Sequence, residues 1–191
     1  MILTPEEYNV FLKVHLDLLY YTGKKHKIFN AGTSLKDFKD FPLENKFECR
    51  EYFNEHPDIL EEFIKQNQTK LSSQHMKILD GFRSRIVSDY FIILKCLKKH
   101  AIFIDNDSKK VYGVLGLSNP FHDFFYDFPV VVKTTILPFN GKIIYDGFLQ
   151  SYETYLGPNM TWEYNEIYKE AKIKRQIITS LDPPNTDLMI K

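Results

Sequence analysis

The stretch VVVKTTILPFNGKIIY, residues 130–145, decides the fold of the second half of the chain. It begins with a run of β-branched residues, which favour strands, and ends with β-branched and aromatic residues at 143–145, which favour them too. Between them stands Asn140-Gly141, the strongest short signal for a tight hairpin turn, because both residues tolerate a positive φ. The stretch therefore predicts two antiparallel strands joined by a hairpin.

Three further runs rich in β-branched and aromatic residues precede this hairpin. They begin at Tyr90, Ala101 and Val111, and turn residues such as those at 105–108 and 118–120 separate them. Several short strands at close spacing predict an antiparallel meander or a small β-barrel. A last helix is expected after Gly157, to about Lys174, lying across the sheet, because apolar residues keep helical spacing there.

The first half of the chain predicts helices. Thr4-Pro5-Glu6-Glu7 is a capping box with proline at the first helical position, and apolar residues follow it at three- and four-residue spacing. Gly23, followed by basic residues, predicts that this helix ends at about Thr22. Shorter helical segments follow, separated by Pro42 and Pro57.

The predicted organisation is therefore α+β. Residues 1–82 form a helical region that packs on residues 83–181, an antiparallel meander or small β-barrel with a final helix. Ile177–Thr179 predicts a terminal strand, and residues 182–191, which begin with Asp-Pro-Pro, predict a flexible tail.

Composition narrows the class of protein. The 191 residues include 25 basic and 25 acidic side chains, so no overall charge favours nucleic acid or a membrane as partner. Cys49 and Cys96 lack metal-ligand spacing and predict reduced thiols rather than a disulfide or a zinc site. The first residues lack the features of a signal peptide, and no apolar run approaches the roughly 20 residues that span a bilayer. We expect a cytoplasmic protein without a cofactor or a membrane partner.

Four motifs in the second half resemble those of a known family. They are VYGVLGL (111–117), FPVVVK (128–133), LPFNGKIIYDG (137–147) and QIITSL (176–181). Over about residues 82–181 the chain resembles a family of uncharacterised microbial proteins with the pattern VYGVLGL…LPFxGKIIYDG…IITSL. The resemblance implies a shared fold and no activity, since that family has no assigned function. Asn119 departs from the pattern, which has an acidic residue before the proline.

His122, Asp123 and Asp146 are candidates for metal-dependent chemistry. An imidazole beside carboxylates can hold a divalent ion and activate water. Asp146 also precedes Gly147, and aspartate before glycine commonly forms a turn. No HExxH, GxSxG or phosphate-loop motif accompanies them, so we assign no catalytic or metal-binding residue.

Phe121, Phe124, Phe125 and Tyr126 place four aromatic side chains within six residues. Bounded by two proline turns, they predict either a plug over one end of the barrel or an interaction patch, and we favour the plug.

Basic residues gather in two turns of the predicted sheet: Lys98, Lys99, His100, Lys109 and Lys110. If these adjacent turns form one cationic rim, the rim and neighbouring aromatic residues could grip single-stranded nucleic acid. A solvated sheet edge, protected from aggregation by lysines, is the alternative.

These patterns favour a non-catalytic module that binds a macromolecule through the β half. An acidic segment at 36–65 and a basic one at 77–110 favour a protein partner or self-association over RNA or single-stranded DNA. Two alternatives stay open: a small metal-dependent hydrolase or nuclease that uses His122, Asp123 and Asp146, and an inhibitor of a defence system or a toxin.

Overall fold

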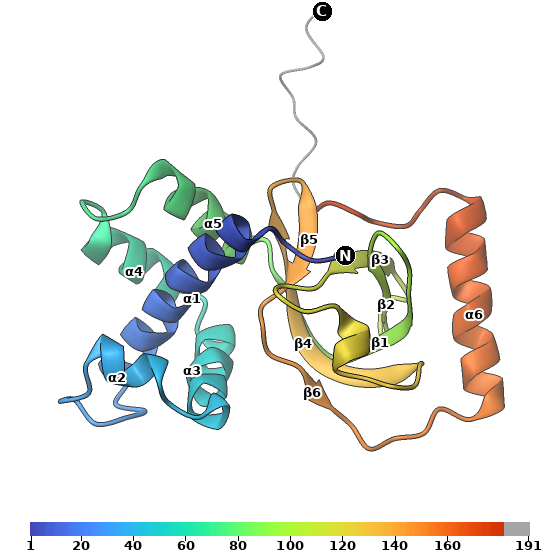
Figure 1. Cartoon of the computed structure of the whole chain (residues 1–191), viewed down its shortest axis with the longest axis horizontal. Helices are drawn as coiled ribbons and strands as arrows, with labels where there is room; N and C mark the ends of the chain where they lie inside the picture. The colour runs from blue at the N-terminus through green and yellow to red at the C-terminus, as the bar shows by residue number, and fades with distance from the viewer. Residues whose placement is uncertain (182–191) are drawn as a thin grey trace, which may run out of the picture. The chain divides into compact units, whose positions relative to one another are not determined.

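The computed structural model describes residues 1–181, and the tail expected at 182–191 lies outside them. Within the described residues the protein is α+β, with six α-helices and a six-stranded mixed sheet. The chain divides into a helical unit, Leu3–Arg83, and a sheet unit, Met1–Ile2 with Ser84–Lys191 (Figure 1). None of the described helices is both long enough and apolar enough to cross a membrane.

Five helices build the helical unit. They are α1 (Pro5–Lys25), α2 (Leu35–Lys39), α3 (Leu43–Glu55), α4 (Ile59–Asn67) and α5 (Ser73–Arg83). Helix α1 is central, because it contacts each of the other four (Figure 1). Its apolar face is buried at Phe11, Val14, Leu18 and Leu19, which are at most 2% exposed.

The expected capping box at the start of α1 is confirmed. The Glu7 backbone N–H donates to Thr4 Oγ1 over 3.2 Å, and the Thr4 N–H donates to Glu7 Oε2 over 3.1 Å. Two backbone donors that the helix leaves unpaired are satisfied in this way.

The predicted end of α1 at Thr22 is wrong, since the helix continues to Lys25 and is capped at His26. Gly23 is buried within the last turn, and its role is close packing rather than termination. A Cβ atom at this position would clash with the Phe29 ring and lie 2.7 Å from Cys49 Sγ. Glycine is therefore required because two neighbouring side chains occupy the space.

The sheet unit contains six strands and two helices. They are β1 (Ile86–Cys96), β2 (Ala101–Asp105), β3 (Val111–Leu115), the 3-10 helix η1 (Phe121–Asp123), β4 (Val130–Phe139), β5 (Lys142–Tyr145), β6 (Gln150–Ser151) and α6 (Pro158–Ile173). The hairpin at Asn140-Gly141 is confirmed: β4 and β5 pair antiparallel, and the two turn residues have φ values of 50° and 73°.

The predicted α+β class is confirmed, but the sheet is mixed, whereas the sequence predicted an antiparallel meander or small β-barrel. The strand order is β1-β2-β3-β5-β4-β6, and β3 pairs parallel with β5. Strand β1 also pairs with β4, so the pairings among β1 to β5 close into a ring. The reason is the long connection 116–129, which separates β3 from β4 and lets the β4–β5 hairpin return β5 to the free edge of β3.

Strand alternation gives the sheet two different apolar faces. On one face the Phe103 ring centroid lies 5.8 Å from that of Phe91 and 5.1 Å from that of Phe121. The other face forms a second cluster with α6, in which Ile102 and Ile104 pack with Tyr164, Tyr168 and Ala171. The predicted helix thus covers the sheet, as expected, and after it Ile178 forms a single parallel bridge with Tyr112 instead of a full strand.

We expect the Gly23→Ala variant to be less stable than the wild type, although alanine is the better helix former by about 1 kcal/mol. The added methyl group must displace Phe29 and Cys49, and overpacking of a filled core costs about 1–3 kcal/mol. Urea unfolding followed by circular dichroism measures the difference. Gly157→Ala is the matched control, because a Cβ there has no neighbour within 4 Å. Equal stability of the Gly23→Ala and wild-type chains would contradict the packing argument.

Candidate functional site

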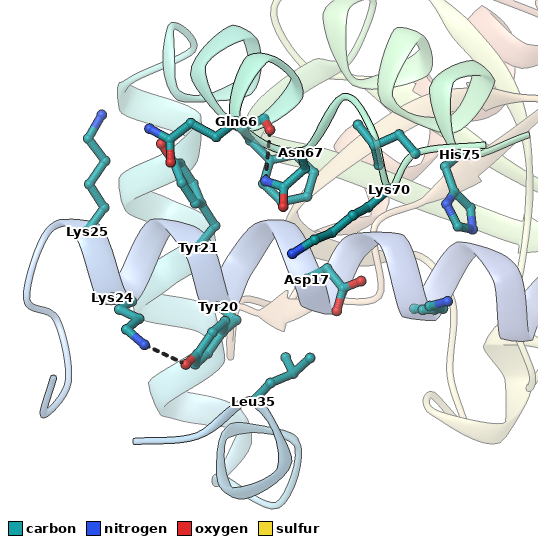
Figure 2. Close-up of a pocket in the computed structure, with 13 residues that line it drawn as sticks. Asp17, Tyr20, Tyr21, Lys24, Lys25, Leu35, Gln66, Asn67, Lys70 and His75 are labelled. Atoms are coloured by element: carbon teal, nitrogen blue, oxygen red, sulfur yellow. Dashed lines mark hydrogen bonds between the residues drawn. The ribbon is translucent and has the colours of Figure 1, made fainter. Parts of the chain in front are cut away.

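A groove of about 700 Å³ lies within the helical unit (Figure 2). One wall is a single face of α1, and the other comes from the end of α4, its connection to α5, and the start of α2. Figure 2 shows α1 running along the groove with these side chains around it. The α1 wall consists of Lys13, Asp17, Tyr20, Tyr21, Lys24 and Lys25.

The spacing of these residues explains why they share a wall. Positions three and four apart lie on the same face of a helix. Burial of the apolar face of α1 against the helical core leaves this polar face to form the groove. The opposite wall presents Phe63 and Asn67 on α4 and Lys70 in the connection after it. His75, near the start of α5, completes this wall.

The groove is strongly cationic, although the chain has no net charge. Four lysines line it, with one carboxylate. Lys25 forms an ion pair with Glu62 of α4, which neutralises it. Over the described part of the chain, Lys13, Lys24 and Lys70 have no carboxylate within 4.0 Å. Three ammonium groups are therefore available to an anionic ligand.

Tyr20 fixes one of these ammonium groups. Its hydroxyl donates to the backbone oxygen of Thr33 over 2.9 Å, and Lys24 Nζ donates to the same hydroxyl over 3.1 Å. The Tyr20 ring stacks on Phe29 at a centroid distance of 5.8 Å. Tyr20 is therefore a rigid part of the wall that positions Lys24, and its ring is already packed.

The Tyr21 hydroxyl is buried and has no hydrogen-bond partner among residues 1–181. Its ring packs edge-on against Phe63, with centroids 5.4 Å apart, and burial raises the pKa of its phenol. A buried donor without a partner costs about 1–3 kcal/mol, so such groups usually meet a ligand or water. Tyr21 therefore contributes a neutral, buried hydroxyl to the α1 wall of the groove.

Asp17 is the carboxylate of the groove, and it is half-buried. Burial raises its pKa, while the charges of Lys13, Lys39 and His75 lower the pKa less strongly. Within the described residues the carboxylate makes no hydrogen bond and no ion pair. Its two oxygens are therefore free to accept hydrogen bonds from a ligand.

The metal-site candidates of the sheet unit do not form a cluster. His122 and Asp123 are both exposed, with Nε2 and Oδ1 3.5 Å apart. Asp146 is only 2% exposed, and its Oδ1 accepts from the Phe148 N–H over 3.2 Å, the turn geometry that was the alternative interpretation. Residues 1–181 contain no group of three His, Cys, Asp or Glu side chains that could hold a metal ion.

The aromatic loop is divided between two environments. Phe121 is 2% exposed and packs on Phe103 and Tyr145, as a plug would. Phe125 is half-buried beside Phe128, whereas Phe124 and Tyr126 are exposed. Only part of the loop is therefore available to a partner.

The two basic turns of the sheet do not form one rim. Lys98, Lys99 and His100 precede β2, whereas Lys109 and Lys110 follow it, so the turns lie at opposite ends of that strand. They are adjacent in sequence, but successive turns of a meander alternate between the ends of the sheet.

Two of these basic residues are also engaged in packing. Lys109 Nζ lies 3.9 Å from a Glu163 oxygen and 4.9 Å from the Tyr164 ring centroid, both on α6. The ring of His100 fills the space above Gly113. The cationic rim expected from the sequence is therefore divided and partly occupied.

Sequence reasoning missed the groove. In the sequence, the α1 wall of the groove is a set of polar residues at helical spacing. An ordinary solvent-exposed helix face has the same pattern. Only the fold brings Asn67, Lys70 and His75 opposite that face. Comparison of the chain with protein-family models, curated proteins and solved structures found no match. The resemblance over residues 82–181 therefore stays a prediction.

We expect the Asp17→Asn variant to be more stable than the wild type at pH 7. Burial raises the pKa of the folded-state carboxyl above its unfolded value, so the folded chain binds the proton more tightly and loses stability as pH rises through the folded pKa. The asparagine side chain is uncharged at every pH, as the protonated aspartic acid is. The difference in free energy of unfolding should therefore shrink as the pH falls towards about 4, the ordinary range of a carboxyl group.

Urea titrations at several pH values measure this difference. Asp40→Asn, the same change at an exposed aspartate in the same unit, is the control and should have little effect. A wild type more stable than Asp17→Asn at pH 7 would show that the ionised carboxylate stabilises the fold.

Proposed function

We propose that the chain is a non-catalytic binding module whose helical unit binds single-stranded nucleic acid in the lysine-lined groove. The observation that supports this proposal is the convergence of Lys13, Lys24 and Lys70, none of them ion-paired in the described chain, on one cavity. An anionic ligand lying in the groove can pair with each of these ammonium groups in turn.

The length of the cationic row favours a polymer over a single phosphate. Lys13 and Lys24 are three turns apart on α1, which corresponds to about 16 Å along the helix axis. Successive phosphates of one strand repeat about every 3.4 Å along the axis of B-DNA and lie further apart in an extended strand. The row is therefore long enough to meet several phosphates in succession.

The size of the groove favours a single strand over a duplex. Its volume of about 700 Å³ lies within the range of small-ligand sites, which admit one or a few nucleotides but not a double helix. Single-strand binding sites usually combine a cationic groove that tracks the backbone with aromatic residues on which bases stack. Because Tyr20 is already stacked on Phe29, we assign recognition to charge and hydrogen bonds rather than to base stacking on that ring.

The sheet unit supports this assignment indirectly. The face formed by Ile102 and Ile104 is covered by α6, and Phe121 is buried. The β half therefore offers less of the recognition surface that the sequence suggested. A protein partner, an inhibitory role and metal-dependent hydrolysis stay predictions, and the exposed Phe124 and Tyr126 are the residues of the aromatic loop open to a protein partner.

The charge-reversal variant Lys13→Glu/Lys70→Glu tests the proposal. Fluorescence anisotropy with a labelled oligouridine RNA of about eight nucleotides should show affinity reduced at least about tenfold. With three phosphate contacts, wild-type affinity should also fall roughly twentyfold between about 50 and 200 mM salt. Lys98→Glu/Lys99→Glu has the same change in net charge at the β1–β2 turn and should bind within about twofold of the wild type.

Three results would contradict the proposal. Loss of affinity in the control but not in Lys13→Glu/Lys70→Glu would place the site on the sheet unit. A mononucleotide that binds as tightly as the oligomer would identify a small phosphorylated ligand as the occupant. Absence of binding by the wild type at low salt would exclude a nucleic-acid site.

A further inference from the structure

We infer that Asp17 makes the groove selective for RNA over DNA, by accepting a hydrogen bond from a ribose 2′-hydroxyl. This inference rests on the proposed function, and it names the class of nucleic acid and the residue that distinguishes it. It depends on the position of Asp17, on its unused oxygens and on the chemistry of the two sugars.

Asp17 occupies the middle of the α1 wall. It follows Lys13 by one turn and precedes Tyr21 by one turn, so a strand that contacts both ends of the row must pass it. Figure 2 shows its carboxylate among the labelled residues of the groove, with the Lys70 side chain extending across towards α1. A ligand bound by the lysines therefore lies within reach of this carboxylate.

Within the described helical unit, the charges of Lys13, Lys39 and His75 favour a carboxylate at this position, but no hydrogen bond or ion pair holds it. Asp17 lies in the middle of α1, where it gains no stabilisation from the helix dipole, which favours acidic groups only in the first turn. It is also half-buried, which is unfavourable for a charged group.

A carboxylate beside phosphates weakens binding unless the ligand donates a hydrogen bond to it. An ionised carboxylate has acceptor atoms only, so it needs a donor on the ligand. The 2′-hydroxyl supplies one such donor on every nucleotide of RNA, and DNA has none at that position. Donors on the bases are the same in RNA and DNA of matched sequence. Asp17 is therefore attractive to RNA and repulsive to DNA.

Anisotropy with labelled oligouridine, oligodeoxyuridine and 2′-O-methyl oligouridine of equal length tests this inference. The wild type should bind the RNA about tenfold more tightly than the DNA, since hydrogen bonds to charged groups are among the stronger ones. The 2′-O-methyl strand keeps the 2′-oxygen but cannot donate, so it should bind like the DNA.

Two variants separate recognition from structure. Asp17→Ala should bring the ratio of RNA to DNA affinity close to one, chiefly by strengthening DNA binding as the repulsion is lost. Asp17→Asn keeps an acceptor oxygen without the charge. Its ratio of RNA to DNA affinity should therefore lie between those of the wild type and Asp17→Ala. A change that only damaged the fold would weaken both ligands and leave the ratio unchanged, which would overturn the inference.

The outcomes for the wild type distinguish the two proposals. Equal affinity for RNA and DNA would overturn the role of Asp17 and leave the proposed function standing. Tight binding of the 2′-O-methyl strand would show that sugar conformation, not donation to Asp17, explains any preference. Binding of neither RNA nor DNA would overturn both proposals.

Discussion

Burial of the apolar face of α1 is the constraint on which the helical unit depends. Phe11, Val14 and Leu18 are at most 2% exposed, and α1 contacts every other helix of the unit. Because a helix is rigid, fixing this face also fixes the direction of the polar one. The core and the groove are consequently two results of the same packing, and the positions of Lys13 and Asp17 depend on that of α1.

The sequence was informative wherever a local rule decides the structure. The capping box at Thr4, the hairpin at Asn140-Gly141 and the helix after Gly157 are each determined by residues within a few positions of one another. Long-range features were not accessible in this way. The parallel pairing of β3 with β5 depends on where a 14-residue connection returns the chain. Gly23 is required by Phe29, which follows it beyond the end of α1, and by Cys49 on α3, which is distant in sequence.

The candidate site is also a long-range feature, which local sequence patterns do not predict. One wall of the groove is visible in the sequence as a polar helix face, but a face becomes a site only when a second wall lies opposite to it. The basic turns of the sheet show the opposite case: Lys98–His100 and Lys109–Lys110 are close in sequence, but β2 places them at opposite ends of the strand. The net charge does not predict the cationic groove, since a chain with no net charge can still concentrate lysines at one place.

Backbone amide chemical-shift mapping with oligouridine RNA tests the location of the site most directly. Titration of the labelled full-length chain should shift the amides of α1 between Lys13 and Lys24 together with those of residues 66–75, which form the two walls. Amides of the sheet unit should change little. The largest shifts at the basic turns 98–110 or in the aromatic loop 121–126 would contradict this assignment and place recognition on the sheet.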